Sequence, residues 1–148
     1  MHAGEAMLYV GDLMSTGLFT LKKTDSLRAA RSLMQLARIR HIPIVDAKGD
    51  FQGLLTHRDI LSATISRFAD VDEAVQNEID SGIPVGEIMR TDVVCVHPGT
   101  LLRDAAELLL HHKYGCLPVT EDNRLVGIVT EADFLKLTIS LLDAVEHP

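Results

Sequence analysis

The sequence predicts an α+β fold of two βαββα units that pack on each other with pseudo-twofold symmetry. One observation is an internal repeat: with a shift of 75 residues, VGDLM at 10–14 falls on VGEIM at 85–89, and IPI at 42–44 falls on LPV at 117–119. A second is that the offset becomes 74 after the next turn, where GLLTHRDIL at 53–61 falls on GIVTEADFL at 127–135. A repeat of this length defines the structural unit, and two copies can each cover the other's apolar face.

The composition limits the classes of partner. The chain has 148 residues, a mass of 16.2 kDa and a net charge of −7. This charge argues against non-specific binding to nucleic acid or anionic lipid, which needs Lys and Arg to neutralise phosphates. No apolar stretch reaches the length of a membrane span. We therefore expect a cytoplasmic protein with no nucleic-acid partner and no membrane partner.

The first copy reads as a helical turn, a short extended run, a helix, two strands and a second helix. Leu27, Ala30 and Met34 keep helical spacing, with Asp25 as the expected N-cap. Pro43 lies near the start of an apolar strand, and Gly49 lies in the turn that follows it. The expected ranges are 10–14, 18–21, 27–38, 41–45, 51–55 and 58 onward, with the turn at 47–50.

The second copy repeats this order. Thr100 holds the position of Asp25, so a capping residue is again expected before a helix. The expected ranges are a helix at 102–112, strands at 116–120 and 125–129 joined by a turn at 121–124, and a helix from 132 to about 145.

A connector lies between the copies. Its apolar residues have near-helical spacing, so we expect an amphipathic helix that ends at Ser81-Gly82 and Pro84. Its acidic side is expected to face solvent and contains Asp70, Asp72, Glu73, Glu78 and Asp80. The domain boundaries are then 8–66 for the first copy, 67–84 for the connector and 85–142 for the second copy.

Each copy carries a Thr-x-x-Asp pair where a strand runs into a helix: Thr56 with Asp59, and Thr130 with Asp133. Such a pair is typical of a helix N-cap, in which Thr and the acid satisfy free N–H groups. The same corner is also suited to a sugar phosphate. The helix N-terminus and the Thr hydroxyl can bind phosphate, and a carboxylate can accept both hydroxyls of a ribose. The two roles do not exclude each other.

These residues resemble the cystathionine β-synthase (CBS) domain family, in the tandem form called a Bateman module. The match rests on the VGDLM and VGEIM lead-ins, on HIPIV at 41–45 and CLPVT at 116–120, and on both Thr-x-x-Asp runs. It covers about residues 8–140, without a catalytic, transport or DNA-binding domain, so a stand-alone module is expected.

The resemblance implies an adenosine-type ligand, such as AMP, ADP, ATP or S-adenosylmethionine, in clefts between the copies. It implies ribose acceptors at Asp59 and Asp133 and phosphate contacts at Thr56 and Thr130. Base-side contacts are implied at Arg40, His41, Ile42 and Thr20 in the first copy, and at Gly115, Cys116, Leu117 and Cys95 in the second. It further implies a homodimer that signals to a downstream protein, unidentified from sequence, by a change in conformation.

The two copies differ in charge around their motifs. His57 and Arg58 lie within the first motif, whereas Glu131 and Ala132 hold those places in the second. Because arginine binds phosphate well, we expect phosphorylated ligands to prefer the cleft that contains Asp59. The cleft that contains Asp133 is expected to bind more weakly or to take a less charged adenosine.

Two other classes of protein compete with this interpretation. An enzyme or a metal protein is disfavoured, because no histidine or cysteine lies in a nucleophile or metal motif, and we expect neither catalytic residues nor a metal site. Cys95 and Cys116 are expected to be small buried residues. The serious alternative is a ligand-free dimeric scaffold, in which the Thr-x-x-Asp pairs act only as helix caps.

Overall fold

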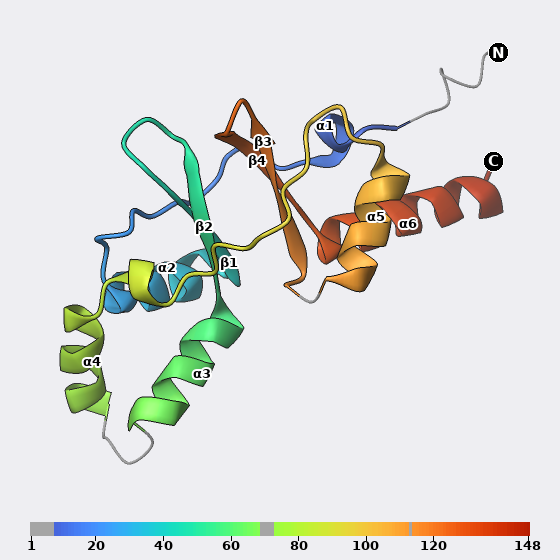
Figure 1. The fold of residues 1–148 in the computed structure, drawn as a ribbon. Coiled ribbons are helices and arrows are strands. Elements are labelled where there is room, and N and C mark those ends of the chain that lie inside the picture. Colours follow the sequence, from blue (N-terminus) through green and yellow to red (C-terminus); the bar gives the residue numbers. More distant parts are fainter. Residues whose placement is uncertain (1–7, 69–72, 113) are drawn as a thin grey trace. The chain divides into compact units, whose positions relative to one another are not determined.

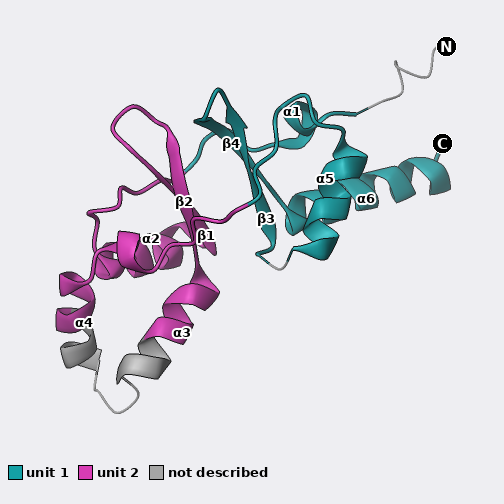
Figure 2. Cartoon of the chain, in the orientation of Figure 1, with its two compact units in different colours: residues 1–18, 94–148 teal, residues 19–93 magenta. Residues whose placement is uncertain are grey.

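The computed structural model describes residues 8–68, 73–112 and 114–148, which form two compact units (Figures 1 and 2). Unit 2 is the continuous segment Phe19–Val93, and unit 1 combines Met1–Leu18 with Val94–Pro148. Each unit has helices, one two-stranded antiparallel sheet and its own apolar core. The predicted α+β class is confirmed.

Unit 2 is built around the hairpin of β1 (His41–Val45) and β2 (Phe51–Thr56), in which His41 lies opposite Thr56. The core forms where the apolar side of α2 meets the hairpin, with Leu27, Met34 and Ile44 all buried. Burial of such side chains contributes ~1.5–3 kcal/mol each. The elements are α2 (Leu27–Ala37), β1 (His41–Val45), β2 (Phe51–Thr56), α3 (His57–Phe68), α4 (Glu73–Gly82) and the 3₁₀ turn η2 (Val85–Glu87).

Unit 1 repeats this plan with the second hairpin. Cys116 lies opposite Thr130, and buried residues of α5 and of the hairpin form the core, among them Leu109 and Val119. The elements are α1 (Val10–Leu13), α5 (Leu102–His111), β3 (Cys116–Glu121), β4 (Arg124–Thr130) and α6 (Glu131–Glu146). The expected first strand of each copy is a single bridge, from Leu21 to Ile44 and from Val96 to Val119.

The lead-in of each copy belongs to the unit of the other copy. Val10 is buried in the core of unit 1, and Val85 is buried in the core of unit 2. The residue that follows each lead-in pairs with the returning strand: Ser15 with Ile128 of β4, and Arg90 with Leu54 of β2. Each unit therefore combines segments from both sequence repeats.

Two glycines make this pairing possible. A Cβ on Gly53 would lie 2.7 Å from the Arg90 carbonyl oxygen, and a Cβ on Gly127 would lie 3.0 Å from the Ser15 carbonyl oxygen. The prediction that these glycines allow close packing of a neighbouring strand is confirmed, and the neighbour is the lead-in.

The predicted N-caps are wrong by one residue. Ser26 caps α2 by accepting the Ala29 N–H at 3.1 Å, while the Asp25 carboxylate accepts the Lys22 N–H at 2.7 Å. Leu101 precedes α5 without a side-chain cap, and Thr100 accepts the His97 N–H at 3.1 Å. Both predicted caps stabilise the turn before the helix instead.

The expected solvation of the connector's acidic side is wrong for Asp80. Glu78 is exposed, but Asp80 is completely buried and forms an ion pair with Arg31 of α2. Asp70 and Asp72 lie outside the described residues, as does the side chain of Glu73. None of the described helices is both long and apolar enough to cross a bilayer.

Candidate functional site

The first candidate site is the corner between β2 and α3 in unit 2. The Asp59 N–H donates to Thr56 Oγ1 at 3.1 Å, and the Thr56 hydroxyl donates to Asp59 Oδ2 at 2.7 Å. The Thr56 N–H also points to Asp59 Oδ2, at 3.4 Å. This reciprocal arrangement caps α3.

The second candidate site is the equivalent corner between β4 and α6 in unit 1. The Asp133 N–H donates to Thr130 Oγ1 at 3.2 Å, and the Thr130 N–H donates to Asp133 Oδ2 at 2.9 Å. The capping role predicted for both Thr-x-x-Asp pairs is therefore confirmed. Because a capped corner still presents the positive end of a helix, it remains suited to an anion.

The pairing of the strands brings the expected base-side segments to these corners. The His57 N–H donates to the Arg40 carbonyl at 2.9 Å, and the Glu131 N–H donates to the Gly115 carbonyl at 3.1 Å. His41 lies opposite Thr56 in the hairpin. The segment before each Pro is thus held against the start of its helix.

Other expected contacts differ in what they can offer a ligand. His57, Arg58 and Thr20 have exposed side chains, and Thr20 precedes Leu21, whose N–H donates to the Pro43 carbonyl. In contrast, the side chains of Ile42, Leu117 and Cys116 are fully buried. In this conformation these three could offer a ligand only backbone groups.

The two cysteines lie in unit 1, and neither forms a disulfide in the described part of the chain. Burial, helped by the nearby charges of Cys95 and Glu131, raises the pKa of the Cys116 thiol to about 12. Burial also raises the pKa of the half-buried Cys95 thiol. Both thiols are therefore protonated at neutral pH. The expected burial is confirmed for Cys116 and is only partial for Cys95.

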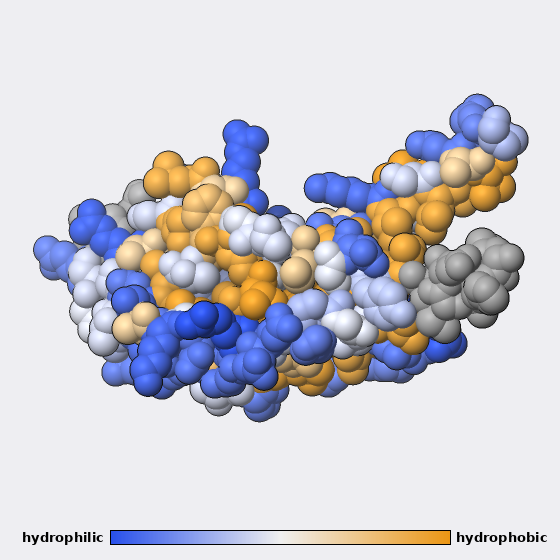
Figure 3. Space-filling view, turned by 90° about the horizontal axis from the view of Figure 1, so that it is seen from above, coloured by the Kyte–Doolittle hydropathy of each residue, from blue (hydrophilic) through white to orange (hydrophobic). Residues whose placement is uncertain are grey.

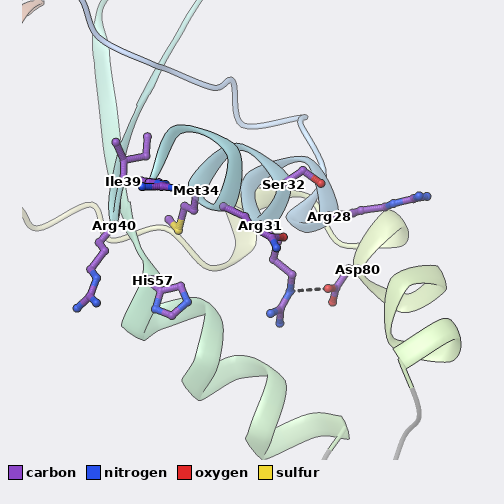
Figure 4. Close-up of a pocket in the computed structure, with 10 residues that line it drawn as sticks. Arg28, Arg31, Ser32, Met34, Ile39, Arg40, His57 and Asp80 are labelled. Carbon is purple, nitrogen blue, oxygen red and sulfur yellow. Dashed lines mark ion pairs between the residues drawn. The ribbon is translucent and has the colours of Figure 1, made fainter.

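Positive charge gathers next to the first corner. A groove of about 780 Å³ in unit 2 is lined by arginine side chains from α2 and from the segment before β1, and by a histidine at the start of α3. Figure 4 shows Arg40 and His57 close together at one side of this groove, while Arg31 reaches Asp80. The cationic residues that line it are Arg28, Arg31, Arg38 and Arg40, with His57 beside them.

One residue at the first corner was not expected from the sequence. The Arg90 guanidinium contacts the Asp59 carboxylate through Nε, at 3.0 Å from both oxygens, and through Nη2, at 2.8 Å from Oδ1. The alignment of the two repeats could have drawn attention to Arg90. It aligns with Ser15, so only one copy has a cation directly after its lead-in. The described residues contain no cluster of three or more His, Cys, Asp or Glu side chains suited to a metal ion.

Comparison with known proteins identifies the family. The family model described as the CBS domain matches the chain twice, at residues 10–76 and 85–140. The chain therefore belongs to the CBS-domain family and contains a tandem pair of these domains, as the resemblance implied.

Solved structures with the same fold include CBS pairs with bound ligands. An acetoin utilization protein (AcuB) from Vibrio cholerae is 38% identical, with 95% of this chain and 98% of that chain covered and a TM-score of 0.82. CBSX2 from Arabidopsis thaliana, in complex with AMP, is 26% identical over 90% of this chain and 97% of its own, with a TM-score of 0.75. The CBS domain pair of protein MJ0100, in complex with 5-methylthioadenosine and S-adenosyl-L-methionine, is 25% identical over 90% and 98%, with a TM-score of 0.75.

Proposed function

We propose that this protein is a cytoplasmic regulatory module that binds an adenosine-containing ligand, namely AMP, ADP, ATP or S-adenosylmethionine. The ligand changes the conformation of a homodimer, and a downstream protein reads that change. No chemistry is performed on the ligand.

The observation that carries this proposal is the repeated Thr–Asp corner. In both units an acceptor carboxylate and a Thr hydroxyl lie at the N-terminus of a helix of twelve or more residues. The carboxylate suits ribose hydroxyls, and the helix N-terminus suits phosphate. AMP and S-adenosylmethionine, the ligands of the two similar CBS pairs, both contain an adenosine.

The role of each residue follows from its chemistry. Asp59 and Asp133 accept the ribose hydroxyls, while Thr56 and Thr130 turn their hydroxyls toward phosphate. A ligand shifts the conformation only as far as it binds one state more tightly than the other. Signalling therefore needs a ligand whose contacts differ between the two states.

The test is a thermal-shift screen of nucleotide-stripped protein against AMP, ADP, ATP, S-adenosylmethionine, NADH and cyclic di-AMP. A ligand at one hundred times its dissociation constant adds about 2.7 kcal/mol to the free energy of unfolding. We expect a clear rise for one adenosine compound and a smaller rise in Asp59→Asn and Asp133→Asn. The amide still accepts the Thr N–H of the cap, so these variants test the ribose contact with little damage to the fold. No rise with any compound would contradict the proposal.

A specific observation also supports the second candidate, a ligand-free dimeric scaffold. The polar groups of both corners are already satisfied by capping, and α6 exposes several large apolar side chains (Figure 3, along the helix at the right). Leu135, Ile139 and Leu142 recur at helical spacing, as expected for a stripe that packs on another chain.

Light scattering tests the dimer that both candidates share. We expect the parent protein to be dimeric and Ile139→Glu to be largely monomeric, because a charge in an apolar interface is costly. Lys136→Glu changes charge at an exposed position outside that stripe and serves as the control. A dimer unchanged by Ile139→Glu would show that α6 is not the interface.

A further inference from the structure

The first corner already has a cation where a ribose would bind. Both oxygens of Asp59 accept hydrogen bonds from Arg90, and Oδ2 also accepts from the Thr56 hydroxyl. The Asp59 side chain is 11% exposed and that of Arg90 is 43% exposed, so the guanidinium covers the carboxylate from the solvent side. A carboxylate has about four acceptor positions, and these contacts use most of them.

The backbone fixes Arg90 in this place. Its N–H donates to the Leu54 carbonyl at 2.8 Å and its carbonyl accepts the Leu54 N–H at 2.9 Å. Leu54 lies two residues before Thr56, so pairing with β2 holds the Arg90 side chain over the first turn of α3. Because the side-chain torsions of Arg90 lie outside this backbone pairing, the guanidinium can leave Asp59 without breaking the bonds to Leu54.

The second corner lacks this feature. Ser15 occupies the place of Arg90 and pairs with Ile128 through the same two backbone bonds, at 2.9 and 3.0 Å. Serine carries no charge and so cannot form an ion pair with a carboxylate, and Asp133 forms none with any described residue. The repeats thus differ in whether the ribose acceptor is covered by a cation.

We propose that Arg90 determines the ligand selectivity of the first repeat, which deepens the proposed function and rests on it. A ribose reaches Asp59 only when Arg90 moves away, and the released guanidinium needs a new anion. A phosphate bound at Thr56 and the helix N-terminus supplies it, because guanidinium and phosphate form bidentate hydrogen bonds. A neutral adenosine supplies none.

The first repeat therefore selects phosphorylated adenosines, and the second repeat accepts ribose without displacing a cation. This agrees with the phosphate preference expected from the charges near Asp59 and gives it a specific origin. It also agrees with the expectation that the Asp133 corner takes a less charged adenosine, because a neutral ligand has no cation to displace there.

The test compares binding of AMP and adenosine by isothermal titration calorimetry, using the full-length, nucleotide-stripped chain. Asp133→Asn serves as the background, so that binding reports on the first corner. There, Arg90→Ser should strengthen adenosine binding by up to about fivefold, the scale of a partly exposed ion pair, and should weaken AMP binding. Ser15 shows that serine is compatible with the same backbone pairing, and circular dichroism checks that the variant folds.

Two matched variants control for charge and position. Arg58→Ser removes an exposed cation of the same motif that forms no ion pair with Asp59 in the described structure, and it should not strengthen adenosine binding. Ser15→Arg, in an Asp59→Asn background, should transfer the preference for AMP to the second corner.

The outcomes separate the two proposals. If AMP and adenosine bind and Arg90→Ser leaves their affinity ratio unchanged, the role of Arg90 is overturned while the proposed function stands. If neither compound binds the parent or any variant at millimolar concentration, the role of Arg90 is overturned, and the thermal-shift screen with the other adenosine compounds decides whether the proposed function stands. A ratio of AMP affinity to adenosine affinity that falls about fivefold or more supports both.

Discussion

Replacing Gly53 with alanine should separate the second lead-in from the sheet of unit 2. The new Cβ would lie 2.7 Å from the Arg90 carbonyl oxygen and 2.8 Å from Met89 Sδ. Since carbon contacts are normally about 3.5–4.0 Å, the lead-in must move outward, which strains the two hydrogen bonds between Leu54 and Arg90.

The cost can be worked out from these contacts. Overpacking typically costs ~1–3 kcal/mol, and replacing glycine within a strand recovers ~0.5–1 kcal/mol of backbone entropy. The difference is about 0–2.5 kcal/mol, and the upper part of this range, about 1–2.5 kcal/mol, is expected because the nearest atom belongs to the backbone. At about 2–4 °C per kcal/mol for a chain near this size, the expected fall in Tm is roughly 2–10 °C.

The assay is urea denaturation followed by circular dichroism, with thermal melts alongside. Gly82→Ala is the matched control, because a Cβ there meets nothing within 4 Å. That change should be neutral or stabilise the protein by up to ~1 kcal/mol. Equal stabilities for the Gly53 and Gly82 variants would refute the argument that the lead-in packs directly on β2.

Three further predictions concern buried groups. Asp80→Ala should lower the unfolding free energy by up to ~3 kcal/mol. This is the low end for a broken buried ion pair, because the Arg31 side chain is 29% exposed. Urea denaturation measures the loss, with Glu78→Ala as the control, and equal losses in the two variants would contradict the burial of Asp80. Cys116 should react with iodoacetamide at pH 8 more slowly than Cys95, because burial raises the pKa of the Cys116 thiol to about 12. Mass spectrometry of the labelled, folded protein measures the two reaction rates. Preferential labelling of Cys116 would contradict the prediction. Because the pKa of the same thiol in the unfolded chain is close to its ordinary value of 9.0, the unfolded chain loses that proton first as pH rises. The unfolding free energy should therefore fall between about pH 9 and 12, and it should fall less in Cys116→Ala. An equal fall in the parent protein and in Cys116→Ala would show that other groups are responsible.

The local parts of the fold could be predicted because their causes are local. The hairpins follow from apolar runs around turn residues, and the helix starts follow from capping chemistry at Thr56 and Thr130. The errors at Asp25 and Thr100 have the same origin. Asp25 and Ser26 are both good caps, and the choice depends on the Leu27 N–H donating to the Ile83 carbonyl, a contact far along the chain.

The parts that were missed depend on pairing between distant segments. Arg90 lies 31 residues after Asp59 and reaches it only because the lead-in of one repeat pairs with the strand of the other. Asp80 lies on the polar side of an amphipathic pattern, but its burial depends on Arg31 in another helix. Periodicity assigns a side of a helix, whereas the partner that covers it is set by tertiary structure.

The division into a continuous and a discontinuous unit has a consequence for synthesis on the ribosome. All of Phe19–Val93 is synthesised before Val94–Pro148, so unit 2 can begin to fold before unit 1 is complete. Residues 8–18 precede unit 2 in the chain but belong to unit 1, where Val10 packs with Val129. We therefore expect unit 2 to fold first, and residues 8–18 to pack only after the later segment has been made.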